Sequence, residues 1–337
     1  GTPADFGRPP DTGRMRFRTG VALVAAAGVG AVAVGVWGVS SLLDSVSPLF
    51  QSDECTATVS GRTVTLSVEQ AENAALITAV SVARGMPARA ATIALATAYQ
   101  ESKLYNLESG DRDSAGLFQQ RPSQGWGTRA EVMNPVHATN AFYDALEKVD
   151  GYESMRVTVA AQEVQRSGYP EAYADHEADA RVLASALTGN SPHAFSCRLG
   201  DEPDPAGRKL TDSGLTHRAD VVRQELDEVF GDPPMGGFAP GGVSSGHMEG
   251  SAHYDGRAVD VFVRPVSAEN KIRGWAMAQY LVAMADRLAI RTVIFDDRIW
   301  TAGSSSGDGW RDYDPPESSG DRAILEHRDH VHVDVYP

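Results

Sequence analysis

Residues 251–260 read SAHYDGRAVD and residues 326–334 read EHRDHVHVD, and together they decide the fold of the second half of the chain. Histidine or aspartate alternates with valine over residues 330–335, which predicts a half-buried strand with its polar side chains on one face. Residues 258–263 form a second predicted strand, which carries Asp260. Two imidazoles and a carboxylate suit Zn²⁺ with an open fourth position for water, as hydrolysis requires.

The spacing of these residues also carries a family resemblance. Ser-x-His-x-x-Gly-x-Ala-x-Asp, together with His-x-x-His-x-His, resembles the LAS group of zinc peptidases. That group includes D-alanyl-D-alanine carboxypeptidases and dipeptidases, lysostaphin-like enzymes and penicillin-insensitive murein endopeptidases. The resemblance covers residues 246–336 and implies that His253, Asp260 and His332 are the zinc ligands.

The same resemblance suggests roles for the neighbouring residues. His330 would stabilise the transition state or handle the proton, and His327 matches a further histidine of the murein endopeptidases. The carboxypeptidases have a glutamate three residues before the last ligand, whereas this chain has Asp329, a shorter catalytic base. Gly256 would allow a tight turn between the first two ligands. His247 could add a ligand, but we assign it to a loop.

A second candidate site surrounds Glu101, near the end of an apolar segment, residues 87–102, that we expect to be helical. Partial burial there would raise the pKa of Glu101 and keep a proton available for donation to a leaving oxygen. The Gly-Leu-Phe-Gln run at residues 116–119 would let a sugar chain approach closely. On chemistry alone the alternative stays open, because a glutamate at a helix end is more often solvated or capping.

The Glu-Ser pair, followed by Ser-x-Gly-Leu-Phe-Gln-x-x-Pro, is similar to the catalytic region of the lysozyme-like lytic transglycosylases over residues 67–189. The resemblance implies that Glu101 is the single general acid/base that cleaves the β-1,4 link between N-acetylmuramic acid and N-acetylglucosamine. The substrate's N-acetyl group would replace the second carboxylate used elsewhere. Ser102, Gln119 and Gln120 would contact the glycan.

Two further observations bear on the rest of the glycan site, one departure from the family pattern and one alternative source of a second carboxylate. The family's Ala-Tyr-Asn-Ala-Gly segment has only a loose counterpart in residues 160–162 and Tyr173. Asp111 and Asp113 could instead supply a second carboxylate for an inverting mechanism, although loop aspartates most often cap turns.

Hydrophobic periodicity separates the chain into a helical part and a mixed part. The first is expected to be all-α, with a capping box at Ser67 and Gln70 opening its first helix. Its predicted helices are 67–85, 87–102, 136–149, 155–165 and 172–187. A polar linker at 198–215 follows. The remainder is expected to be a small α+β domain with an antiparallel sheet, with helices at 216–230 and 268–288 and strands at 258–263, 292–295 and 331–335.

The charge balance argues against nucleic acid as a partner. The 337-residue chain has 45 acidic and 30 basic residues and a net charge of −15, which would repel a phosphate backbone. No patch rich in lysine and arginine, interleaved with aromatic residues, reverses this locally.

Residues 19–43 carry no charged side chain and are long enough to span a membrane. Arginines precede this segment and acidic residues follow it, so the positive-inside rule places residues 1–18 in the cytoplasm and the C-terminal region outside the cell. The alternative is a cleaved signal peptide and secretion. In an oxidising compartment Cys55 and Cys197 would pair, closing a loop around one domain, although two free buried thiols remain the alternative.

These observations predict a multidomain protein with a cytoplasmic tail (1–18), a transmembrane helix (19–43), a lysozyme-like domain (55–197), a linker (198–215) and a LAS-type zinc peptidase domain (216–337). The expected function is a membrane-anchored peptidoglycan hydrolase that cuts glycan strands and stem-peptide amide bonds, the latter with Zn²⁺. A regulatory partner protein would gate it. The alternative is a non-catalytic or singly active peptidoglycan-binding component of a secretion, conjugation or wall-assembly complex.

Overall fold

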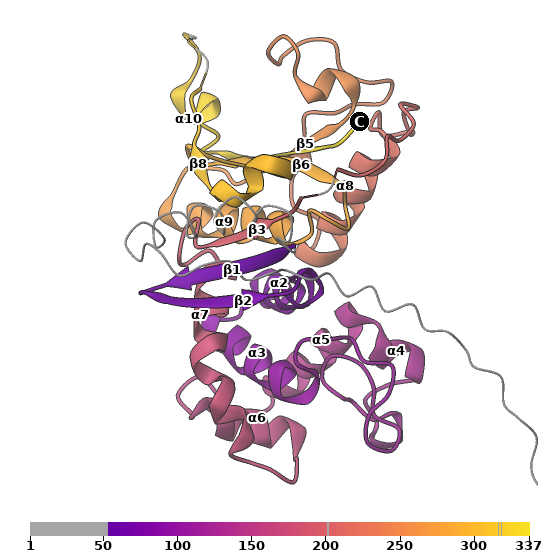
Figure 1. Ribbon diagram of the computed structural model, residues 1–337, viewed down its shortest axis with the longest axis vertical. Helices are drawn as coiled ribbons and strands as arrows, with labels where there is room; N and C mark the ends of the chain where they lie inside the picture. Colours follow the sequence, from indigo (N-terminus) through magenta and orange to yellow (C-terminus); the bar gives the residue numbers. More distant parts are fainter. Residues whose placement is uncertain (1–52, 201, 316, 318) are drawn as a thin grey trace, which may run out of the picture. The chain divides into compact units, whose positions relative to one another are not determined.

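A computed structural model describes residues 53–337 except 201, 316 and 318 (Figure 1). The expected cytoplasmic tail and transmembrane helix, residues 1–18 and 19–43, lie outside the described residues. Within the described part of the chain, no helix combines the length and the apolar character needed to cross a membrane. The described residues all belong to one compact unit.

Residues 54–198, which we call the helical half, follow the predicted helices closely. Ser67 caps the first helix and forms the predicted capping box with Gln70. The elements are β1 (Glu54–Val59), β2 (Arg62–Leu66), α2 (Val68–Ala83), α3 (Ala88–Ser102), η2 (Pro122–Gln124), α4 (Arg129–Met133), α5 (Pro135–Leu146), α6 (Val157–Gln165), η3 (Ala172–His176), α7 (Glu177–Leu187) and β3 (Phe195–Arg198).

The helical half is not all-α as predicted, because it also contains a small antiparallel sheet ordered β2-β1-β3. The β1–β2 hairpin turns at Ser60 and Gly61, both at positive φ, and threonine and valine, which favour strands, fill much of it. In the register of β1 and β3, Cys55 lies directly opposite Cys197. The two are joined by a disulfide, as the sequence predicted, which ties the entry of the helical half to its exit.

Residues 215–337, which we call the sheet half, contain a six-stranded antiparallel sheet ordered β4-β5-β9-β6-β7-β8. Its elements are α8 (His217–Phe230), β4 (Met235–Gly236), η4 (Ala252–Asp255), β5 (Ala258–Phe262), α9 (Ala268–Ala283), β6 (Ile290–Phe295), β7 (Arg298–Thr301), η5 (Gly303–Asp308), β8 (Arg311–Asp312), α10 (Arg322–Leu325) and β9 (His330–Val335). Because β9 is an inner strand, it is buried throughout rather than half-buried.

The two halves pack directly on one another. Helix α9 contacts β6 on one side and α2 and α7 on the other (Figure 1). The fully buried Gln279 of α9 donates to Ala186 O at 2.6 Å and accepts from Phe195 N at 2.8 Å. Leu199 directly follows β3, and both its backbone N–H and its carbonyl oxygen form hydrogen bonds with the Ser306 hydroxyl of the sheet half. The start of the expected linker is therefore fixed against the sheet half.

Candidate metal centre and candidate glycan site

Three donor atoms from the two predicted metal-binding stretches converge in the sheet half. His253 Nε2 lies 3.2 Å from Asp260 Oδ1 and 3.2 Å from His332 Nδ1, and the latter two lie 3.0 Å apart. Asp260 and His332 meet because they are direct partners in the β5–β9 register. His253 reaches them from η4, which Gly256 ends at positive φ. The structure thus brings together the three residues that the LAS resemblance implies as ligands.

The other nitrogen of each imidazole has an oxygen partner. His253 Nδ1 lies 2.8 Å from Gly237 O, which can only accept, so this nitrogen donates the hydrogen bond. His332 Nε2 lies 3.5 Å from a carboxylate oxygen of Asp334. Such partners orient metal-binding histidines and fix their tautomer in metalloproteins.

The charges of this cluster are strongly coupled. Burial by itself raises the pKa of Asp260, but hydrogen bonds with His253 and His332 outweigh it and hold the pKa well below its usual range. Burial by itself lowers the pKa of His332, but Asp260 and Asp334 outweigh it and raise the pKa to about 9. The cluster therefore favours one positive charge among its donors, which a proton or a metal cation can supply.

The donor set fits zinc. Tetrahedral Zn²⁺ with bonds of about 2.0–2.1 Å to nitrogen and oxygen requires ligand atoms about 3.3 Å apart. The three separations given above are close to that value, and His253 and Asp260 are 3% and 7% exposed. Two imidazoles and one carboxylate would leave the fourth position of a tetrahedral ion open.

His330 and Asp329 form a short chain that leads to this cluster. His330 Nδ1 lies 2.7 Å from Asp329 Oδ1, while Arg264 Nε donates to Asp329 Oδ2 at 2.7 Å. His330 Nε2 lies 3.8 Å from Asp260 Oδ1. With both its carboxylate oxygens engaged, Asp329 is placed to orient His330, whereas the sequence suggested a base at this position.

His327 is also beside the cluster, at positive φ just before β9. Its ring centroid lies 4.6 Å from that of His330 and 5.7 Å from that of His332. Burial lowers the pKa of His327 to about 3, with a further contribution from the two neighbouring imidazoles. Its Nδ1 has no hydrogen-bond partner within the part of the chain that the structure describes. An imidazole with a buried Nδ1, unpaired among the described residues, therefore lies beside the cluster.

His247, which the sequence analysis assigned to a loop, stacks on a candidate ligand. Its ring centroid lies 3.8 Å from that of His253. Donor atoms of His247, His253 and Asp260 all lie within 4.8 Å of one another, so a second potential metal-binding set shares two members with the first.

In the helical half, Glu101 lies in the last turn of α3 and is partly buried. Tyr173 Oη donates to Glu101 Oε1 at 2.8 Å. Burial raises the pKa of Glu101, partly opposed by hydrogen bonds with Tyr173 and Gln165. Burial thus shifts this carboxyl in the direction that a general acid requires. The sequence noted Tyr173 only as a loose family counterpart, and no spacing signal pointed to Gln165.

The three residues proposed to contact glycan differ in their surroundings. Ser102 is buried, and its hydroxyl lies 2.7 Å from Leu117 O, so it fastens the Gly-Leu-Phe-Gln loop to α3. Gln120 is also buried and donates to Ala138 O in α5. Gln119 is half-buried, and its side chain bonds within its own loop, to Gly116 O and the Ser114 hydroxyl.

The two loop aspartates have different environments. The backbone N–H of Ser123 and the guanidinium of Arg121 hold the pKa of Asp113 well below its usual range. Both donors lie 2.8 Å from its carboxylate, so Asp113 braces the loop. The Asp111 side chain is 91% exposed, and Arg112 Nε lies 3.9 Å from it.

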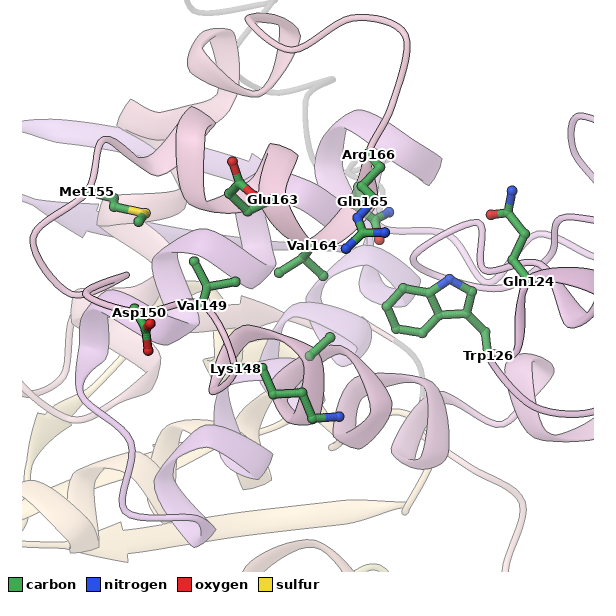
Figure 2. Close-up of a pocket in the computed structure, with 11 residues that line it drawn as sticks. Gln124, Trp126, Lys148, Val149, Asp150, Met155, Glu163, Val164, Gln165 and Arg166 are labelled. Atoms are coloured by element: carbon green, nitrogen blue, oxygen red, sulfur yellow. The ribbon is translucent and has the colours of Figure 1, made fainter.

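A cleft of about 810 Å³ opens between α5, α6 and the loop around η2 (Figure 2). Trp126 and Gln124 line one part of it, while Lys148 and Asp150 line another. Gln165, at the end of α6, lines the cleft, donates to Phe118 O at 2.8 Å and also lies close enough to Glu101 to lower its pKa. Gln165 therefore lies beside both the cleft and the candidate acid.

Comparison with known proteins bears on the sheet half. A family model described as the C-terminal domain of VldE matches residues 211–323, which is less than half of the chain. The matched part contains His247, His253 and Asp260 and ends before His327. No curated protein matches this chain. This part of the sheet half is thus similar to the C-terminal domain of VldE.

Proposed function

We propose that the protein is a peptidoglycan hydrolase with two catalytic sites, one for stem-peptide amide bonds and one for glycan strands. The observation that carries the proposal is the convergence of His253 Nε2, Asp260 Oδ1 and His332 Nδ1 at separations of 3.0–3.2 Å. The sequence resemblance to wall peptidases supplies the substrate class.

His253, Asp260 and His332 would hold the zinc ion. When bound, Zn²⁺ supplies Lewis acidity, which lowers the pKa of water and polarises a carbonyl oxygen. His330 handles the proton: its Nδ1 donates to Asp329, so its Nε2 is directed to the candidate metal-binding side, where it can take a proton from the attacking water and pass it to the leaving amine. Arg264 holds Asp329 in place, and Gly237 and Asp334 orient the two histidine ligands.

At the second site Glu101 donates a proton to the leaving glycosidic oxygen. Its partial burial raises its pKa, which is the direction that a general acid requires. Tyr173 fixes one carboxyl oxygen, and Gln165, which lines the cleft together with Trp126, lies beside the carboxyl. Because Asp113 is engaged by Arg121 and Ser123, we assign no second carboxylate and assign assistance to the substrate's own N-acetyl group.

An extracytoplasmic location agrees with the Cys55–Cys197 disulfide, because such bonds persist in oxidising compartments. We propose that residues 19–43 anchor the chain in the cell membrane with the C-terminal region outside, or serve as a signal segment before secretion. Peptidoglycan is then the accessible polymer, and a partner protein that gates both cuts belongs to the same proposal.

The zinc site is tested by metal content and products from purified sacculi. The region from residue 53 to 337 is expected to bind one equivalent of zinc and to release peptide-cleaved muropeptides, and a chelator should abolish only these products. His253→Ala should lose both zinc and this cut, whereas the exposed His217→Ala serves as the matched control. A zinc-free parent protein that sediments with sacculi but releases no product would favour the binding-module alternative.

Glu101→Gln keeps the size and hydrogen-bonding capacity of the side chain but removes its acid. Glycan cleavage should fall by about 10²–10⁴-fold, while zinc-dependent peptide cleavage is retained. Mass spectrometry of muropeptides, which also separates anhydro from hydrolysed sugars, measures both. Glu153→Gln, an exposed glutamate in the same half, is the control. Equal glycan products from the parent and Glu101→Gln would remove Glu101 from the catalytic role.

A further inference from the structure

We infer that His247 is a fourth, displaceable ligand of the candidate zinc site, so that the protein's own loop can hold the peptidase site closed. The inference rests on the proposed zinc peptidase. It concerns the regulation of that site and assigns a ligand that the resemblance to known zinc peptidases does not provide.

The first support is distance. The His247 donor atom lies within 4.8 Å of those of His253 and Asp260, and its ring stacks on that of His253 at 3.8 Å. Donors of a tetrahedral zinc site are about 3.3 Å apart. Because two stacked rings cannot both direct a lone pair at the same ion, His247 coordinates after its ring turns out of the stack on His253 and moves closer to the other donors, completing a set of four. With the nearby His332, that set consists of three imidazoles and one carboxylate.

The second support is the way in which the His247 backbone is held. The Tyr254 hydroxyl accepts from His247 N at 3.0 Å and also donates to His247 O. Tyr254 directly follows the ligand His253 in sequence, so one side chain fixes the loop residue beside the site. This is a specific clamp, because a hydroxyl used in both directions engages both backbone groups of the same residue.

The third support is that the rest of this segment is lightly packed. Gly246 and Gly250 bracket His247 at positive φ, and a Cβ at either glycine would meet nothing within 4 Å. The intervening Met248 side chain is 54% exposed. The clamp by Tyr254 therefore sits in a segment that can move away without disrupting a packed core.

The chemical consequence follows from ligand number. Zinc sites with four protein ligands are closed, whereas hydrolytic sites keep one position for water or substrate. With His247 coordinated, the site binds metal tightly but lacks that position. Displacement of residues 246–250 by substrate or by a protein bound to this loop would open it and allow hydrolysis.

The experiment compares His247→Ala with Met248→Ala, a matched control in the same loop, and with Tyr254→Phe, which retains every donor but removes the clamp. Zinc affinity is measured by competition with a chromophoric chelator, and coordination by visible absorption of the Co²⁺-substituted proteins with and without acetohydroxamic acid. His247→Ala should bind zinc at least about tenfold more weakly, give a changed Co²⁺ spectrum and bind acetohydroxamic acid more tightly. Tyr254→Phe should show smaller shifts in the same direction, and Met248→Ala none.

The outcomes separate this inference from the function on which it rests. If the parent binds zinc and His247→Ala matches it in affinity, spectrum and acetohydroxamic acid binding, His247 is not a ligand, while the peptidase proposal stands. If the parent binds no zinc at all, both fall. Thermal unfolding of each metal-free variant shows whether a lost signal reflects misfolding. If His247→Ala is misfolded, Tyr254→Phe decides alone. Shifts in its zinc affinity and Co²⁺ spectrum support His247 as a ligand, and their absence rejects it.

Discussion

Gly237→Ala is expected to abolish stoichiometric zinc binding and the zinc-dependent cut. The Cβ of an alanine would lie 2.3 Å from His253 Cε1, 2.6 Å from His253 Nδ1 and 2.9 Å from Asp260 Oδ2. No rotamer of the new residue relieves this, because a Cβ is fixed by the backbone. The same substitution displaces the carbonyl that orients His253. Loss of such an orienting partner alone costs about 10–100-fold in metal affinity, and displacement of two ligands adds to that loss.

Gly241→Ala is the matched control for this variant. Gly237 and Gly241 have φ values of +79° and +84°, so alanine carries the same backbone penalty at both, but a Cβ at position 241 meets nothing within 4 Å. Zinc content and thermal stability of the two variants therefore isolate the steric effect on the ligands. Parent-like zinc affinity in Gly237→Ala would contradict the ligand geometry given above.

Removal of the disulfide is expected to have the largest effect on stability. Cys55 and Cys197 are 142 residues apart, and in the chain-entropy model closing a loop of this length restricts the unfolded state by about 4–5 kcal/mol. The double variant Cys55→Ser, Cys197→Ser should lose about that much free energy of unfolding, measured by urea denaturation at neutral pH.

The control for that measurement is the parent protein with its disulfide reduced. Reduction opens the same loop but keeps both cysteine side chains. Both preparations should unfold at a similar, lower urea concentration than the oxidised parent. A change below about 1 kcal/mol would mean that reduced chains retain the constraint by residual structure in the unfolded state.

Alternation and family spacing predicted the strand and the donor residues that form the candidate metal centre. Valine at every second position of residues 330–335 placed His330, His332 and Asp334 on one face of a strand, and the structure has β9 there. Alternation sets the face of a side chain, but the partner strand and its register depend on long-range packing. The pairing of Asp260 with His332 across β5 and β9 was therefore visible only in the fold.

The residues that sequence reasoning missed act through their backbone or through distant contacts. Gly237 contributes a carbonyl from a segment rich in glycine and proline, where periodicity carries no signal. Gln165 reaches Glu101 from a helix more than 60 positions away, and so does Tyr173, for which the sequence offered only a loose family counterpart. The sequence predicted no strand over the β1–β2 hairpin, because polar residues dominate its exposed positions and its apolar side chains face inward.

The disulfide also determines how mechanical load would travel through the molecule. Cys55 is the second residue of β1, the central strand of its sheet, and is bonded to Cys197 at the end of the helical half. Tension applied between residue 53 and the sheet half passes through this covalent bond and bypasses α2 to α7, which lie inside the loop. If the N-terminal segment is anchored while the sheet half grips a substrate, the helical half and its Glu101 site are shielded from the pull.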